Sequence, residues 1–250
     1  MSQAYGAGQG FRVGRVFTRS FEVLFRHFPL FFLLAAVPGL PNLYVAIAFG
    51  RASARALAAA WPTLALQYLV PFVLVILLQP IIEAIVLYGT FQDMRGRPFG
   101  IGESVVKGLA RFLPIIGLIL CQSLIYMFGA LLLLIPLFIF ITMYYVALPV
   151  CVLEQAGPIT SLKRSAQLTR GYRWPLFGIM CLIGLLSWFG VGVVTGMLAI
   201  SGGLLAANIG TFVWSSLVRA LTAIMTAVVY HDLRVAKEGI DTDRIAAVFD

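Results

Sequence analysis

The sequence predicts an all-α integral membrane protein with six transmembrane helices arranged as three hairpins. Two observations carry this fold class. Of the 250 residues, 61% are hydrophobic and only 11% are charged, against about 25% charged residues in soluble domains. In addition, residues 112–153 form a run of 42 residues without a charged side chain. Because about 20 apolar residues cross the hydrocarbon layer of a bilayer, this run is long enough for two helices.

Six apolar segments are the candidates for the transmembrane helices. They cover residues 29–49, 63–89, 114–134, 137–153, 175–199 and 206–230. Of the 18 basic residues, 15 fall in segments that an even number of crossings puts on one side, and only Arg51 and Arg55 fall on the other. Positive residues in short loops stay in the cytoplasm. The pattern therefore predicts an inner-membrane protein with both termini in the cytoplasm.

A short amphipathic helix is expected before each hairpin, lying in the cytoplasmic interface of the membrane. In residues 11–28 charged side chains recur every three or four positions and apolar side chains fill the other face. Residues 103–113 and 160–173 repeat this pattern in a shorter form. Each stretch runs into a proline, which suits the first turn of a helix. The prolines at these junctions are Pro29, Pro114 and Pro175.

These features divide the chain into one membrane domain, residues 11–239, between a flexible N-terminus, residues 1–10, and a cytoplasmic tail, residues 240–250. Three units of surface helix plus hairpin are expected within the domain. They cover about residues 11–95, 101–156 and 159–234. The first and third hairpins also end in similar sequences, YGTFQDMR from Tyr88 and YHDLR from Tyr230. The alternative is that prolines and arginines recur at membrane borders without any repeat.

The basic residues of the surface helices are predicted to bind the headgroups of anionic phospholipids. They are Arg12, Arg15, Arg19, Arg26, Lys107, Arg111, Lys163, Arg164, Arg170 and Arg173. Nucleic acid is not an expected partner, because no basic patch with interleaved aromatic residues lies on a soluble domain.

Glu83 and Arg219 are the two ionisable residues inside predicted spans, where a charge is costly. One interpretation is a buried ion pair that joins the second and sixth spans. A second is a polar site in a transport pathway or headgroup cavity, together with nearby glutamine and serine side chains. These are Gln67, Gln79, Gln122 and Ser123. A third is that each charge is solvated independently.

Four small or rigid residues suggest details of helix packing. Gly192 and Gly196 form a Gly-x-x-x-Gly pair, which is typical of close packing against a neighbouring helix, with a helix of the same chain favoured over a second copy. Pro71 and Pro80 in the second span suggest a kink that either opens a cavity near Glu83 or fits curved packing.

Three stretches resemble a known family. They are residues 91–98, FQDMRGRP, residues 161–174, SLKRSAQLTRGYRW, and residues 230–239, YHDLRVAKEG. These are similar to the family named after the membrane domain of glycerophosphoryl diester phosphodiesterases, and the likeness covers nearly the whole chain from residue 11. The resemblance implies a stand-alone bacterial membrane domain. The family's catalytic barrel and its His-Arg-Gly motif are absent from this sequence, so the family name implies no activity here.

The sequence favours a non-enzymatic protein without catalytic residues, metal ions or cofactors, since it carries no metal-ligand cluster, nucleophile elbow or phosphate-binding loop. The expected function is to engage anionic phospholipids in membrane organisation, lipid handling or membrane-protein assembly. The alternative is a transporter or channel-like protein for a small amphiphile or lipid, with a cavity around Glu83 and Arg219. Protein partners and a homo-oligomer stay open.

Overall fold

The computed structural model describes residues 13–49, 61–96, 101–132 and 134–238, and every regular element in these ranges is helical. Five segments in these ranges are long and apolar enough to cross a membrane. They are Phe28–Ile47, Leu69–Met94, Phe112–Leu131, Ile135–Leu153 and Arg173–Glu238. At most 39% of the most apolar window of each segment is buried within the protein. Large outward apolar surfaces of this kind mark contact with a membrane. Arg12 and both predicted tails lie outside the described residues.

The first part of the chain contains a short helix followed by two long apolar segments. The elements are α1 (Val13–Arg26), α2 (Phe28–Ala36), the 3-10 helix η1 (Val37–Gly39), α3 (Leu40–Phe49) and α5 (Trp61–Met94). Pro29 lies in the first turn of α2. Pro38 lies in η1, where the chain tightens from α-helical to 3-10 geometry because proline lacks a backbone N–H. The predicted span 29–49 is therefore helical but interrupted.

The second part repeats this order with α6 (Ile101–Ala110), α7 (Phe112–Leu131), α8 (Leu134–Met143) and α9 (Ala147–Leu153). The predicted segment 137–153 coincides with the apolar segment Ile135–Leu153, but turn residues 144–146 interrupt its helix and separate α8 from α9. Side chains of α10 (Pro158–Leu168) and the residue after it explain the break. Ser165 Oγ and Thr169 Oγ1 donate to the Met143 carbonyl at 2.9 and 3.2 Å, and so satisfy a backbone group where the helix ends.

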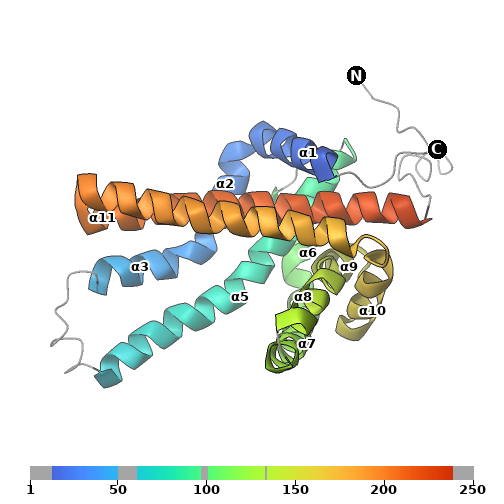
Figure 1. Ribbon diagram of the computed structural model, residues 1–250, viewed down its shortest axis with the longest axis horizontal. Coiled ribbons are helices and arrows are strands. Elements are labelled where there is room, and N and C mark those ends of the chain that lie inside the picture. The colour runs from blue at the N-terminus through green and yellow to red at the C-terminus, as the bar shows by residue number, and fades with distance from the viewer. Residues whose placement is uncertain (1–12, 50–60, 97–100, 133, 239–250) are drawn as a thin grey trace.

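The third part consists of α10 and the 66-residue α11 (Arg173–Glu238), which is not straight. At Gly203 the backbone has φ 73° and ψ −175°, so the helix breaks there. Thr195 Oγ1 lies 2.8 Å from Thr211 Oγ1, which brings the two halves together in antiparallel register. Figure 1 shows the halves of α11 side by side. The predicted segments 175–199 and 206–230 lie one in each half.

Close packing in α11 does not occur where the sequence suggested it. Within the described part of the chain, no atom lies within 4 Å of a Cβ placed on Gly192 or Gly196, so the predicted intrachain contact at this pair is wrong. The close approach lies at Gly190 instead, where a Cβ would overlap the indole ring of Trp214 on the other half. The large ring of Trp214 fits against α11 because Gly190 has no side chain.

The buried core lies toward one end of the molecule. A cluster of buried side chains joins α1, α2, α5, α9 and α11, and it includes Leu24, Phe31 and Tyr230. We call this end, where α1, α6 and α10 lie and where α5 and α11 finish, the basic end. In Figure 1, α1, α10 and the last residues of α11 lie to the right, whereas the start of α5 and the end of α3 lie to the left.

Candidate functional site

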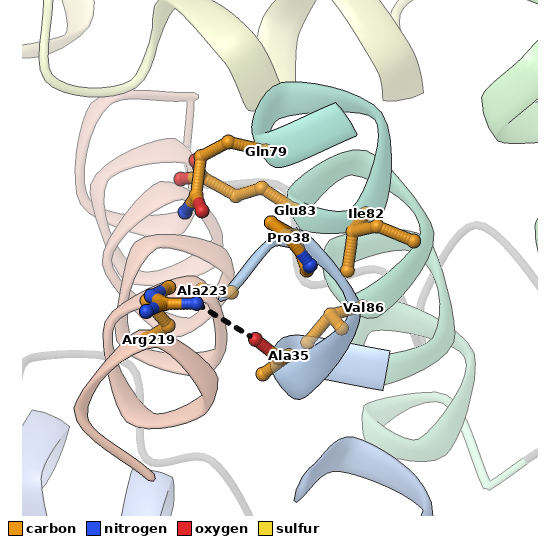
Figure 2. Close-up of a pocket in the computed structure, with 8 residues that line it drawn as sticks. All are labelled: Ala35, Pro38, Gln79, Ile82, Glu83, Val86, Arg219 and Ala223. Atoms are coloured by element: carbon orange, nitrogen blue, oxygen red, sulfur yellow. Dashed lines mark hydrogen bonds between the residues drawn. The ribbon is translucent and has the colours of Figure 1, made fainter. Parts of the chain in front are cut away.

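Glu83 and Arg219 face the same small cavity, which Figure 2 shows between α5, α11 and the junction of α2 with η1. Gln79, Ala35 and Pro38 also line it. Its volume of about 10 Å³ is room for roughly one water molecule. Among the ion pairs of the described residues, none joins Glu83 to Arg219 within 4.0 Å. The structure therefore brings the two charges to one cavity without a direct salt bridge.

The Arg219 side chain has a second task that the sequence did not reveal. Its Nη1 donates to the Ala35 carbonyl at 3.3 Å, next to the 3-10 turn that interrupts the first apolar segment. A Cβ on Gly39 would lie 2.8 Å from Nη1, so the absence of a side chain at Gly39 makes room for the guanidinium group. Broken helices inside a membrane need such partners for their free carbonyls. Arg219 thus links α11 to α2 as well as to the cavity.

We expect Arg219→Gln to lower the free energy of unfolding in detergent by about 1–3 kcal/mol, because it removes a charged donor from a carbonyl in a water-poor site. Glu83→Gln should cost less, because no hydrogen bond to the Glu83 carboxylate occurs among the described residues. The double substitution should be less damaging than the sum of the two effects, since the charges share one cavity. Thermal unfolding followed by circular dichroism measures all three variants.

The control for this cycle pairs Arg219→Gln with Glu22→Gln, because Glu22 is exposed on α1. These two effects should add within about 0.5 kcal/mol. If the Glu83 cycle is equally additive, the two charges act independently and the predicted coupling is wrong.

A second and larger cavity, of about 450 Å³, lies at the basic end. We call it the basic cavity. Four basic side chains reach it, and no carboxylate is among the described residues that line it. Its lining consists of Tyr88, Phe91, Gln92, Arg95, Lys107, Ala110, Arg111, Val152, Leu153, Gln155 and Arg234. The cavity therefore offers a concentrated positive potential beside apolar helices.

The four cations of the basic cavity come from different parts of the chain. Arg95 follows the end of α5 and its guanidinium lies over the Phe91 ring, 5.1 Å from the centroid. Arg111, between α6 and α7, donates from Nη1 to the Gln155 carbonyl at 3.2 Å. Lys107 is exposed on α6. Arg234, on α11, donates from Nε to Glu238 Oε2 at 3.0 Å and is the one of the four with a carboxylate partner among the described residues.

The sequence Asp-x-Arg occurs at the ends of both α5 and α11. In each case the Asp side chain contacts α1 and the Arg side chain lines the basic cavity. Residues two apart on a helix point about 200° apart, to opposite sides. Asp93 faces the end of α1, where Arg26 Nη1 lies 3.3 Å away and Nε2 of His27, the next residue, lies 3.0 Å away, while Arg95, just after α5, lines the cavity.

The end of α11 uses its own Asp-x-Arg sequence in the same way. Asp232 contacts Arg19 of α1 at 3.9 Å, while Arg234 lines the cavity. The two helix ends also contact each other, since the Phe91 and Tyr230 ring centroids are 6.3 Å apart. The similar sequences thus mark two neighbouring helix ends that make the same two kinds of contact.

A closed ring of polar side chains holds Arg234 in place. Glu154, directly after α9, accepts hydrogen bonds from Tyr230 Oη at 2.9 Å and from Arg164 Nε at 3.3 Å. Arg164 also pairs with Glu238, which binds Arg234 in turn. Arg234 Nη1 lies 3.5 Å from Tyr230 Oη and completes the ring. We call these five residues the polar ring, and they tie α9, α10 and α11 together beside the basic cavity.

The residues predicted to bind headgroups have different environments in the structure. Only Lys107 and Arg111 line the basic cavity. Arg19, Arg26 and Arg164 have carboxylate partners within the protein.

The remaining members of the predicted set lie elsewhere. Arg15 lies on α1, Lys163 and Arg170 are exposed on and after α10, and Arg173 is half-buried at the start of α11. Arg95 and Arg234, which also line the basic cavity, were not among the residues predicted to bind headgroups. The Asp-x-Arg sequence to which both belong was the signal that could have identified them.

Comparison of the chain with protein-family models, with curated proteins and with solved structures finds no match. The resemblance to the membrane domain of glycerophosphoryl diester phosphodiesterases therefore stays a prediction that rests on the residues alone.

Proposed function

We propose that this chain is a non-enzymatic inner-membrane protein that holds the headgroups of anionic phospholipids in the basic cavity, in the service of lipid handling, membrane organisation or membrane-protein assembly. The observation that carries the proposal is a cavity of about 450 Å³ with four basic side chains and no carboxylate among its described lining residues. Basic pockets between helices at the cytoplasmic side of a membrane are typical sites for anionic headgroups.

The proposal includes six crossings, with the basic end at the cytoplasmic face. A straight helix of 66 residues would be about 100 Å long, three times the thickness of the hydrocarbon layer. The reversal at Gly203 supports two crossings by α11, and the four other apolar segments supply the rest. The 15 of 18 basic residues on one side favour cytoplasmic termini.

The transporter alternative receives less support. It needs a cavity of substrate size around Glu83 and Arg219, and the cavity there has a volume of about 10 Å³. We therefore favour headgroup binding at the basic end over transport through the bundle.

The lipids that copurify with the protein test the proposed function. Wild type and the variant Arg95→Gln/Lys107→Gln are purified in a mild detergent, and bound lipids are quantified by mass spectrometry. We expect the wild type to be enriched in anionic over zwitterionic lipid relative to the source membrane. This enrichment should fall at least threefold in the variant, because two of the four cations of the cavity are removed.

The matched control is Lys163→Gln/Arg170→Gln, which removes the same charge at two exposed positions that the sequence pattern included in the headgroup-binding set but that lie outside the cavity lining to which the proposal confines binding. It should keep the enrichment of the wild type. An equal loss in both variants would assign lipid binding to general surface charge, and an unchanged enrichment in both would contradict the proposed function.

A further inference from the structure

We infer that the basic cavity selects lipids whose headgroup carries two phosphate groups over lipids with one. This inference rests on the proposed function and narrows its ligand. It follows from the balance of charge in the cavity, from the kinds of donor present and from the apolar surface beside them.

The charges in the cavity exceed what one phosphodiester can neutralise. Of the four cations, Arg234 is paired with Glu238. Arg95, Lys107 and Arg111 have no carboxylate within 4.0 Å in the described part of the chain, and the nearby Glu103 carboxylate, which accepts a hydrogen bond from Tyr88 of the lining at 2.8 Å, offsets one of these three charges. A headgroup with one phosphodiester supplies a single negative charge and would leave one of the two remaining positive charges uncompensated. A headgroup with two phosphates supplies two or three negative charges and comes close to balance.

The donors also suit two phosphates better than one. Arg95 and Arg111 carry planar guanidinium groups, and each can bind one phosphate through two parallel hydrogen bonds. Lys107 adds a compact charge with three donors. These groups come from three separate places, the end of α5, the α6 helix and the junction of α6 with α7. A volume of about 450 Å³ lies in the range of cavities that enclose whole small ligands.

The surface next to the cavity favours a lipid over a soluble anion. Val106 is 64% exposed and lies one turn of α6 before Ala110, which lines the cavity. Exposed apolar side chains beside a polar cavity provide a path for acyl chains while the phosphates enter the cavity. A soluble diphosphate would leave this path unused.

The test measures the midpoint concentration at which each lipid raises the melting temperature of the purified full-length protein in detergent. The first arm compares cardiolipin with phosphatidylglycerol at equal phosphate, with phosphatidylcholine as the blank. The second arm compares farnesyl diphosphate with farnesyl phosphate, and inorganic diphosphate serves as the soluble probe. We expect the two-phosphate lipid to act at a concentration at least tenfold lower than its one-phosphate counterpart in at least one arm, and that arm identifies the source.

The variant Arg95→Gln/Lys107→Gln should reduce this tenfold preference to less than twofold, while Lys163→Gln/Arg170→Gln should retain it. Equal midpoints for one-phosphate and two-phosphate lipids would overturn the inference and leave the proposed function standing. An effect of inorganic diphosphate equal to that of the lipids would overturn the lipid part of the inference. No effect of any anionic lipid would overturn both proposals.

Discussion

Replacing Glu154 by glutamine is expected to lower the free energy of unfolding by about 2 kcal/mol, or roughly 5 °C in melting temperature. In the polar ring, two carboxylates face two guanidinium groups and one tyrosine hydroxyl. The Glu154 side chain is only 21% exposed, so solvent replaces its charge poorly. Glutamine keeps the shape and can still accept from Tyr230, but it leaves Arg164 and Arg234 with the single carboxylate of Glu238.

Thermal unfolding in detergent measures this effect, with Glu22→Gln as the control because Glu22 is exposed on α1. The control should shift the melting temperature by less than 1 °C, in line with other exposed positions. Tyr230→Phe should produce a smaller loss than Glu154→Gln, since it keeps all three ion pairs of the polar ring and removes only the hydroxyl. Equal melting temperatures for Glu154→Gln and Glu22→Gln would show that the polar ring adds no stability.

The positions of the apolar segments could be predicted from the sequence because they depend on local composition. The charge-free run of residues 112–153 contains the segments Phe112–Leu131 and Ile135–Leu153, as predicted. The ends of the helices were less readable. The predicted apolar segments end at residues 89 and 230, whereas the helices α5 and α11 continue to Met94 and Glu238. Polar residues in these extensions, such as Asp93, Asp232 and Arg234, have partners inside the protein, which stabilises the added helical turns.

The site was less predictable because it depends on contacts between distant residues. The sequence shows that Arg19 and Arg26 are basic, but not that Asp232 and Asp93 pair with them. An isolated amphipathic helix would present these arginines to headgroups, whereas α1 packs against α11 through buried Val16 and other apolar side chains. Local charge patterns cannot separate these two cases, since both require the same helical periodicity.

Residues that act together in the basic cavity are also spread along the chain. Arg95 follows α5, Arg111 precedes α7 and Arg234 lies in the last turns of α11, and only the packing of α5, α6, α9 and α11 brings them to one place. The repeated Asp-x-Arg sequence at the ends of α5 and α11 can be recognised in the sequence. The sequence does not show that each Asp faces α1 and each Arg faces the basic cavity, because both contacts depend on the packing of the helices.

The reversal at Gly203 provides the prediction with the largest expected effect on topology. Its backbone has φ 73° and ψ −175°, a conformation that is essentially restricted to glycine and costs other residues about 1–3 kcal/mol. Gly203→Ala should therefore lower the melting temperature, and Gly203→Val should lower it further because a β-branched residue is strained at positive φ. The same substitutions at Gly192 are the controls, since no described atom lies within 4 Å of a Cβ there.

The turn at Gly203 also provides a test of how the chain crosses the membrane. If α11 crosses twice, a cysteine at Ser201 should react with an impermeant maleimide from outside the cell, while a reporter fused at Asp250 stays in the cytoplasm. Cys121, Cys151 and Cys181 are replaced by serine beforehand to remove background labelling. In Gly203→Val we expect labelling at position 201 to decrease, because a turn that no longer forms keeps the two halves from packing at Thr195 and Thr211. Wild-type protein labelled at position 201 only after cell lysis would place the turn on the cytoplasmic side and contradict the six-crossing topology.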